Sequence, residues 1–310
     1  MKPSTLDDYK RRILKVLVRI QEGLDDELSL EELARAACFS SFHFHHIFSG
    51  IMGESLKAHV RRLRLERAAM QLKLSRRPVT RIALDAGYEA PEAFTRVFKA
   101  AYGIAPREFR LKNSPIVALR TQSGVHYGEG KALKNFKTNC SGVRNMKVQI
   151  TKIQSKRVAF IRHIGPYTEV GDAWDKLLPV LGKEGHIGGD SEFIGICHDD
   201  PEVTPADKIR YDACVTVDGT IVPTGEIGLQ TILGGEYAVT THFGPYKKLG
   251  ETYAKLFGQW LPRSGRELGD APSFEVYLND PNSTEPEELV TDICVPLQPG
   301  SRAIQPGCGL

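Results

Sequence analysis

The hydrophobic positions in the first third of the chain follow a helical period and are duplicated. The stretch from Ser55 to Leu74 has apolar residues three and four apart and is predicted to form one continuous helix. Two copies of a second pattern flank this helix, and each consists of two short helices joined by a tight turn. The matched positions, 49 or 50 residues apart, are Leu33 and Ile82, Ala37 and Ala86, Cys38 and Gly87, Phe44 and Phe94, Phe48 and Phe98, and Gly53 and Gly103. Such regularity indicates a duplicated supersecondary unit.

Each copy is predicted to be a helix-turn-helix. In the first copy, Ser29 and Glu32 have the spacing of a capping box, and Ser40 can cap the second helix. In the second copy, Gly87 supplies the turn, and Pro91 stands where its missing N–H costs little. A connecting helix of about 19 residues spans roughly 28 Å. It can therefore hold two recognition helices near one duplex turn apart, so a monomer or weak dimer suffices for DNA binding.

The outward faces of the predicted recognition helices carry side chains that can contact DNA. Arg96 is the best candidate for a guanine contact, whereas Arg61 and Arg62 of the connecting helix suit phosphates. The predicted DNA contacts are Phe42, His45, His46 and Ser49 in the first recognition helix, Glu92, Thr95, Arg96 and Lys99 in the second, and Arg61 and Arg62 between them. The histidine cluster lacks the spacing of a metal site, so neither a metal nor a cofactor is predicted.

The charge of the chain is unevenly distributed. Residues 1–112 carry a net charge of +7, residues 113–146 carry +4 and residues 147–310 carry −8, against +3 for the whole chain. The positive charge therefore accompanies the duplicated helical motif, where binding to phosphates requires it. Charge alone is weaker support, because a solvated helical surface is also charged.

The chain as a whole is predicted to be multidomain and cytoplasmic. Its 310 residues suit at least two domains, and no apolar run is long enough to cross a membrane. The N-terminus lacks a signal-peptide core, and the six scattered cysteines fit a reducing compartment. The predicted parts are an all-α DNA-binding domain at 1–112, a linker at 113–146 with a short strand at 116–119, a second domain at 147–298 and a flexible tail at 299–310.

The second domain is also predicted to be a duplication. The sequence from His163 to Tyr167 returns as His242 to Tyr246, 79 residues later. Alternating apolar positions in each half predict strand, strand, helix, strand, strand. Two such halves predict an α+β domain in which an antiparallel sheet has helices on one face and a pseudo-two-fold cleft between the halves.

The two halves differ at a position suited to ligand binding. When they are aligned at 80 residues, Glu275 replaces Gly195 inside an apolar strand. A buried, unpaired carboxylate is costly and has a raised pKa, so we expect Glu275 to bind a cationic or hydrogen-bond-donating ligand. The predicted aromatic walls of this site are Tyr167, Trp174, Tyr246, Trp260 and Tyr277. The alternative is that Glu275 pairs with a nearby arginine or backbone group, or points to solvent, and that the aromatic residues are core.

Both halves of the chain resemble known families. Residues 25–111 resemble the DNA-binding domain of AraC/XylS-type transcription regulators, on Ser40, Phe44, Phe48, Gly53, Arg64, Ala68, Ile82-Ala83, Gly87-Tyr88, Phe94, Arg96, Phe98-Lys99, Gly103, Ala105-Pro106 and Phe109-Arg110. The sequence departs from that pattern at His46 and Ser49, where arginine and lysine are usual. This departure implies weaker or different base contacts from the first recognition helix.

Residues 147–297 resemble the GyrI-like, Rob/BmrR-type effector-binding domain, an SHS2-type fold. The matching residues are His163, Gly165-Pro166-Tyr167, Gly235, Tyr237-Ala238, Gly244-Pro245, Trp260-Leu261, Gly265 and Phe274-Glu275 with Tyr277. The resemblance implies that a cleft glutamate, best matched by Glu275, contacts hydrophobic and often cationic ligands.

The combined prediction is a transcription regulator, more specifically an activator, controlled by a small hydrophobic ligand. Its expected partners are promoter DNA, the ligand and RNA polymerase, and no catalytic residue is assigned. Two alternatives remain open. One is a constitutive regulator whose second domain binds a protein. The other is a hydrolase with Glu275 as general base and Tyr167 or Tyr246 as oxyanion donor.

Overall fold

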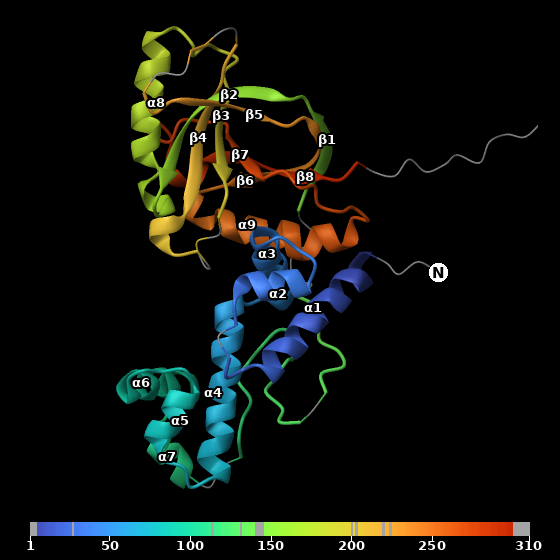
Figure 1. The fold of residues 1–310 in the computed structure, drawn as a ribbon, viewed down its shortest axis with the longest axis vertical. Helices are drawn as coiled ribbons and strands as arrows, with labels where there is room; N and C mark the ends of the chain where they lie inside the picture. The colour runs from blue at the N-terminus through green and yellow to red at the C-terminus, as the bar shows by residue number, and fades with distance from the viewer. Residues whose placement is uncertain are drawn as a thin grey trace, which may run out of the picture. The chain divides into compact units, whose positions relative to one another are not determined.

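The computed structural model divides the chain into two compact units, with a boundary near residue 141 (Figure 1). The structure describes residues 5–26, 28–112, 115–130, 132–139, 146–199, 201, 204–218, 221–222 and 225–299. The predicted flexible tail lies outside the described residues, apart from Pro299. Within the described ranges, no helix is both long and apolar enough to cross a bilayer.

The N-terminal unit is helical and contains both predicted helix-turn-helix motifs. Its helices are α1 (Thr5–Glu22), α2 (Leu30–Ala36), α3 (Ser41–Met52), α4 (Leu56–Leu74), α5 (Val79–Asp85), α6 (Pro91–Tyr102) and α7 (Pro106–Leu111). Helices α2 and α3 form the first motif, α5 and α6 form the second, and α4 joins them (Figure 1). The predicted caps are present, since Ser29 accepts from the backbone N–H of Glu32 and Ser40 from that of His43.

The duplication extends to the backbone conformation of the turns. Cys38 and Gly87, which are repeat equivalents, both have positive φ, at 56° and 83°. Both recognition helices end at a left-handed glycine, Gly53 with φ 73° and Gly103 with φ 80°. The left-handed region suits glycine, whereas Cys38 adopts it at a cost of roughly 1–2 kcal/mol. The turn of the first motif therefore requires a left-handed backbone conformation that cysteine disfavours.

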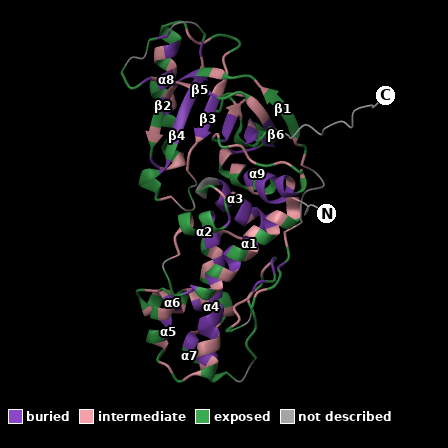
Figure 2. Cartoon of the chain, turned by 45° about the vertical axis from the view of Figure 1, so that its right-hand side comes forward, coloured by how far each residue is buried: buried purple, intermediate pink, exposed green. Residues whose placement is uncertain are grey.

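The connecting helix α4 supplies much of the core of the second motif. Leu65, Ala69 and Leu72 of α4 are buried against Phe94 and Phe98 of α6. Figure 2 shows this burial in purple along α4. The predicted role of this helix as the element that holds the two motifs together is confirmed.

The segment that follows α7 differs from the predicted linker. Residues 116–119 form no strand, and the segment 115–139 packs on the N-terminal unit. Val125 and Phe136 in this segment are only 1% and 8% exposed. Its polar residues had suggested a solvated connection, but the segment has its own apolar anchors and belongs to the fold of the N-terminal unit.

A buried carboxylate of α4 fixes this segment in place. Glu66 is 6% exposed and accepts hydrogen bonds from the backbone N–H groups of Leu119 (3.1 Å) and Tyr127 (2.8 Å). His126 Nδ1 lies 2.9 Å from the same carboxylate, and Arg62 Nη1 donates to it at 3.4 Å. Because these groups come from two separate parts of the chain, Glu66 ties the segment to α4.

In the part of the chain that the structure describes, the C-terminal unit has an eight-stranded antiparallel sheet and two α-helices. Its strands are β1 (Gln149–Ile153), β2 (Lys156–Ile164), β3 (Phe193–Cys197), β4 (Arg210–Thr216), β5 (Gly228–Ile232), β6 (Gly235–Phe243), β7 (Phe274–Tyr277) and β8 (Val290–Leu297). Helix α8 (Gly171–Lys183) follows β2, and α9 (Leu249–Lys255) follows β6. The predicted order of strand, strand, helix, strand, strand in each half is confirmed.

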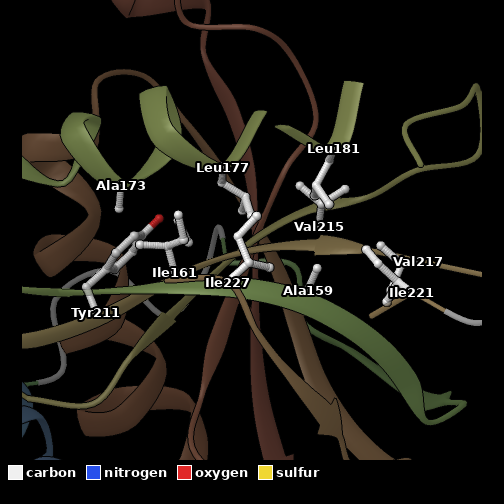
Figure 3. Close-up of a cluster of buried hydrophobic side chains, with 11 residues drawn as sticks. Ala159, Ile161, Ala173, Leu177, Leu181, Tyr211, Val215, Val217, Ile221 and Ile227 are labelled. Carbon is white, nitrogen blue, oxygen red and sulfur yellow. The ribbon is translucent and has the colours of Figure 1, made fainter. Parts of the chain in front are cut away.

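The two faces of the sheet have separate cores. On the helical face, Leu177 and Leu181 of α8 pack against Ala159, Ile161 and Val215 (Figure 3). The opposite face has a second cluster, built from Val158, Ile194, Ile196, Cys214, Ile232, Tyr237, Phe274 and Cys294. Side chains along β3 and most of β4 therefore alternate between two buried environments, and a polar side chain buried there needs a partner inside the protein.

The strand order contains the pseudo-two-fold axis that the duplication predicts. The order β1-β6-β8-β7-β3-β4-β2-β5 is unchanged when each strand is exchanged for its repeat equivalent and the list is reversed. Strands β3 and β7 meet at the centre, where Gly195 lies directly opposite Glu275. Because these residues are also repeat equivalents, the axis passes between them. The glutamate therefore stands on the pseudo-two-fold axis, where positions that are repeat equivalents pair with each other.

We predict that Glu66→Ala releases the segment 115–139 and destabilises the N-terminal unit by about 3 kcal/mol. The substitution leaves two buried N–H groups and the Arg62 guanidinium without their acceptor. Hydrogen exchange measured by mass spectrometry should show faster exchange at Leu119 and Tyr127. Glu129→Ala, an exposed change in the same segment, is the control. Unchanged protection in Glu66→Ala would show that the apolar anchors alone hold the segment.

Candidate ligand site and nucleic-acid interface

The C-terminal candidate site is centred on Glu275 in β7. This side chain is only 4% exposed and faces the helical side of the sheet, because its neighbour Phe274 packs on the opposite face. Tyr277 Oη donates to Glu275 Oε2 at 2.9 Å, and Tyr253 Oη donates to Oε1 at 3.2 Å. The Cys197 thiol donates a weaker hydrogen bond to Oε1, with an S–O distance of 3.7 Å.

The environment of Glu275 disfavours its ionised form relative to a carboxyl group in water. Burial raises the pKa of Glu275, and the hydrogen bonds from Tyr277, Tyr253 and Cys197 only partly oppose that effect. Burial also raises the pKa of Tyr211, Tyr253 and Tyr277 well above the ordinary value, so these hydroxyls remain proton donors. The alternative that Glu275 pairs with an arginine finds no support among the described residues.

Four of the five predicted aromatic walls lie around this carboxylate. The ring centroids of Trp174 and Tyr277 are 5.9 Å apart, and those of Tyr246 and Tyr277 are 5.3 Å apart. Tyr167 packs edge-on against Tyr211, with centroids 6.0 Å apart. Trp260 is different. It ends the helical turn Leu256–Trp260 after α9 and makes no hydrogen bond or ring contact with the described residues around Glu275.

Three side chains at this site were not assigned to it from the sequence. Tyr253 and Cys197 each donate a hydrogen bond to Glu275, and Tyr211 Oη lies within hydrogen-bond distance of Tyr277 Oη, at 3.0 Å. The repeat carried a usable signal, since Tyr253 is the equivalent of Trp174 at 79 residues and Cys197 that of Tyr277 at 80. Tyr211 depends on the pairing of β3 with β4, which the sequence does not reveal.

The predicted cleft between the halves is filled by side chains of the site itself. Tyr211 is 2% exposed and Tyr253 is 5% exposed, whereas Trp174, Tyr167 and Tyr246 are half-buried. A ligand that reaches Glu275 must therefore move aromatic side chains at the rim of the site.

The second recognition helix, α6, presents the predicted polar face. Glu92, Arg96 and Lys99 are exposed, while Phe94 and Phe98 are fully buried. Thr95 is half-buried, and its hydroxyl donates to the carbonyl of Pro91 at 2.9 Å. Because its proton is used in that hydrogen bond, the Thr95 hydroxyl can accept a further hydrogen bond but cannot donate one.

The first recognition helix, α3, fits the prediction less well. His45, predicted to face outward, is 4% exposed, and its Nε2 lies 3.4 Å from Ser49 Oγ. His46 and Ser49 are half-buried. Phe42 lies in α3, but its side chain is outside the described part of the chain. The base contacts assigned to this helix, that of His45 included, stay predictions.

Arg61 and Arg62 are adjacent in α4 but have different environments. Arg61 is exposed, as a phosphate contact requires. Arg62 is 7% exposed, donates to both carboxylate oxygens of Glu54 at 3.1 and 2.6 Å, and donates to the carbonyl of Val125 at 2.8 Å. The assignment of Arg62 to phosphates is therefore corrected, since its guanidinium holds the segment 115–139.

The Arg62 network also includes a buried histidine. His59 Nδ1 lies 2.8 Å from Glu54 Oε1. Burial opposes ionisation of Glu54, but hydrogen bonds from His59 and Arg62 outweigh it and lower its pKa to about 2. Burial likewise lowers the pKa of His59. The network thus keeps a carboxylate and a guanidinium charged inside the unit.

Two family models match the chain, one in each unit. Residues 33–112 match a helix-turn-helix domain, and residues 146–298 match the GyrI-like small molecule binding domain. The chain belongs to the AraC-type regulators with a C-terminal GyrI-like domain. The resemblance found in the sequence is thereby confirmed for both parts.

Several relatives of this AraC-type, GyrI-like chain are known by name. The HTH-type transcriptional regulator YbfP of Bacillus subtilis (strain 168) is 35% identical over 102 residues, which are 33% of this chain and 35% of YbfP. The Right origin-binding protein of Escherichia coli (strain K12) is 33% identical over 98 residues, 32% of this chain and 34% of that protein. The chain thus matches about a third of the length of each of these two relatives.

Two further matches cover most of the other protein. A DNA gyrase inhibitor of Enterobacter lignolyticus (strain SCF1) is 30% identical over 141 residues, 44% of this chain and 88% of the inhibitor. The crystal structure of the EcmrR C-terminal domain is 21% identical, with 50% of this chain and 98% of that chain covered at a TM-score of 0.42.

We predict that Glu275→Gln removes a pH-dependent loss of stability from the GyrI-like domain. Because folding raises the pKa of Glu275, the stabilisation from its proton is complete below about 4.5, the ordinary value, and is lost as the pH rises through the folded pKa. Each pKa unit by which the folded state exceeds the ordinary value contributes about 1.4 kcal/mol to the free energy of unfolding. Urea unfolding followed by fluorescence of Trp174 and Trp260 measures this, with the exposed Glu287→Gln as control. Parallel pH profiles for Glu275→Gln and wild type would contradict the prediction.

Proposed function

We propose that the chain is a ligand-responsive transcription activator that acts with RNA polymerase. Its N-terminal unit binds a specific promoter site through α3 and α6. Its GyrI-like unit binds a small, hydrophobic, cationic molecule at Glu275. The observation that carries the ligand half of the proposal is a carboxylate buried among aromatic rings and hydrogen-bonded only to neutral donors in the described chain.

Three features support binding of a cation at Glu275. A buried carboxylate with a raised pKa gains much of its stabilisation from an opposite charge at close range. Aromatic faces attract cations as well as apolar surface, and Trp174, Tyr246 and Tyr277 supply such faces beside the carboxylate. The rim side chains are only half-buried, so the rings can move apart without unfolding the sheet.

The duplicated motif supports the DNA half of the proposal. Arg96 and Lys99 project from α6 into solvent, and Arg61 lies exposed on the connecting helix. Membership of the AraC-type regulators agrees with this arrangement. Family and geometry together favour promoter binding over a purely structural role for these helices.

A second candidate is binding of a protein partner by the GyrI-like unit. It is favoured by the match that covers 88% of a DNA gyrase inhibitor. The hydrolase alternative is less favoured, because the Tyr167 hydroxyl donates to the carbonyl of Asp199 at 2.6 Å and is therefore engaged elsewhere.

We predict that Arg96→Ala weakens binding to the preferred DNA site by about 1–3 kcal/mol and relaxes selectivity at one base pair. The preferred site is obtained by selection from a random-sequence duplex pool with the wild-type chain. Affinities are then measured by fluorescence anisotropy on that site and its single-base variants. Unaltered selectivity in Arg96→Ala would show that α6 does not read bases through this side chain.

Arg61 and Arg62 provide a matched pair for the phosphate contacts. We predict that Arg61→Ala weakens binding to all sequences alike and lowers the slope of log affinity against log salt by about 1. Arg62→Ala should instead lower thermal stability and keep the salt slope, because its guanidinium is buried. A reduced salt slope in Arg62→Ala with unchanged stability would reverse this assignment.

We predict that tetraphenylphosphonium stabilises the full chain and that Glu275→Gln abolishes the effect. A ligand at about 100 times its Kd adds about 2.7 kcal/mol, which thermal unfolding detects readily. Triphenylphosphine oxide is the neutral comparison, and Glu287→Gln is the matched variant.

The outcomes of this ligand test separate the candidate functions. Equal stabilisation by both compounds would show that charge is not recognised. No stabilisation by either compound, together with binding of purified gyrase, would favour the protein-partner candidate.

A further inference from the structure

A series of hydrogen bonds runs from helix α8 across the pseudo-two-fold axis to Glu275. Trp174 Nε1 of α8 donates to Tyr211 Oη of β4 at 3.1 Å. Tyr211 Oη lies 3.0 Å from Tyr277 Oη of β7, and Tyr277 Oη is 2.9 Å from Glu275 Oε2. The first two residues belong to one half of the duplication and the last two belong to the other.

When Glu275 is ionised, the chemistry of the two ends fixes the direction of every bond between them. An indole N–H can only donate, and an ionised carboxylate can only accept. Tyr277 must donate to the carboxylate, so Tyr277 accepts from Tyr211, and Tyr211 in turn accepts from Trp174. The distance between the two hydroxyls does not by itself say which one is the donor, but the ends of the series do.

The series exists because Gly195 has no side chain. A Cβ atom at Gly195 would lie 2.3 Å from Tyr277 Oη and 2.6 Å from Tyr211 Oη, closer than real contacts. Both hydroxyls therefore occupy the space that a side chain of β3 would fill. The repeat equivalent of this glycine is Glu275 itself, so one half supplies the carboxylate and the other supplies the room for its donors.

We propose that Tyr211 is a positioning residue for the Glu275 site, and that the series reports the charge state of Glu275 to Trp174 on α8. The proposal rests on the proposed function only in taking Glu275 as the ligand contact. Consecutive hydrogen bonds polarise one another, so the strength of the last acceptor affects every donor before it. A protonated Glu275, or one occupied by a cation, is a weaker acceptor for Tyr277, and the bonds back to Trp174 weaken with it.

The other groups around the carboxylate do not replace this series. The ionisable side chains that face Glu275 or respond to its charge are Cys197 of β3, Tyr211 of β4, Tyr253 of α9, Tyr277 of β7, and Tyr167 and Tyr246 after β2 and β6. None of these described groups is a cation. Tyr253 and Cys197 donate to Glu275 Oε1, whereas the series from α8 reaches Oε2.

The test follows the indole N–H signals of the full chain across pH, without any ligand. The chain has two tryptophans, and Trp174→Phe assigns their signals in a ¹H–¹⁵N spectrum. We expect the Trp174 signal to titrate together with the ¹³C carboxyl signal of Glu275, with a midpoint above the ordinary 4.5. Trp260 serves as the internal reference. The Trp174 titration should disappear in Glu275→Gln and in Tyr211→Phe.

Tyr237→Phe is the matched control for loss of a buried hydroxyl. Tyr237 is 2% exposed, like Tyr211, but its hydroxyl donates to the carbonyl of Leu233 at 2.7 Å and its ring packs on the opposite face of the sheet. We expect this variant to keep the Trp174 titration. Persistence of the titration in Tyr211→Phe would overturn the proposal. So would a wild-type chain in which Glu275 titrates and Trp174 does not, a result that requires no variant to fold.

A ligand readout separates this proposal from the proposed function. Without Tyr211, Tyr277 is a weaker donor and Glu275 holds its proton to higher pH. The midpoint of tetraphenylphosphonium affinity against pH should therefore move up in Tyr211→Phe and stay in place in Tyr237→Phe. If tetraphenylphosphonium does not bind at all, the proposed function fails while the indole titration still decides the role of Tyr211. Equal midpoints in both variants would overturn the positioning role.

Discussion

Glu275 places a carboxylate at the centre of an eight-stranded sheet, with no cation beside it in the described chain. Leaving such a group without hydrogen bonds would cost several kcal/mol, so the surrounding side chains are arranged to donate to it. Tyr253 approaches from the helix, Tyr277 from the same strand and Cys197 from the neighbouring strand. All three are neutral, which makes the carboxylate tolerable but leaves its charge unmatched. The site thus holds an acidic group for which the described side chains supply hydrogen-bond donors but no opposite charge.

The N-terminal unit handles its buried charges in the opposite way. Glu54 and Glu66 surround the Arg62 guanidinium, and the backbone of the segment 115–139 supplies further donors and acceptors. The charges in this network are matched internally, so it stabilises one arrangement of the helices and the segment. Glu66 is paired with a cationic side chain inside its unit, whereas Glu275 accepts hydrogen bonds from neutral donors in the described chain. The contrast between Glu66 and Glu275 shows both cases within one chain.

Most of the fold could be predicted from the sequence, because both units are duplications. The offsets of 49 and 50 residues located the turns and caps of α2–α3 and α5–α6, and the offsets of 79 and 80 located the succession of strands and helices along the chain and Glu275. Arg62 was misassigned because helical periodicity does not show that a segment more than 50 residues later covers that face of α4. The segment itself was misjudged because its anchors, Val125 and Phe136, are isolated apolar residues without a period. Tyr211 was missed because its place at the site depends on strand pairing across the sheet.

A duplicated domain also shows where function has altered symmetry. Under exact two-fold symmetry, Gly195 and Glu275 would be the same residue. Two glutamates facing each other would repel, and two glycines would bind nothing. The glycine is therefore as necessary as the glutamate, since it admits the two tyrosine hydroxyls whose direction of donation the carboxylate fixes. Because the two halves differ at this position, the hydrogen bonds across the axis have one direction. In the proposed series, a change in the charge of Glu275 on β7 affects the bonds back to Trp174 on α8.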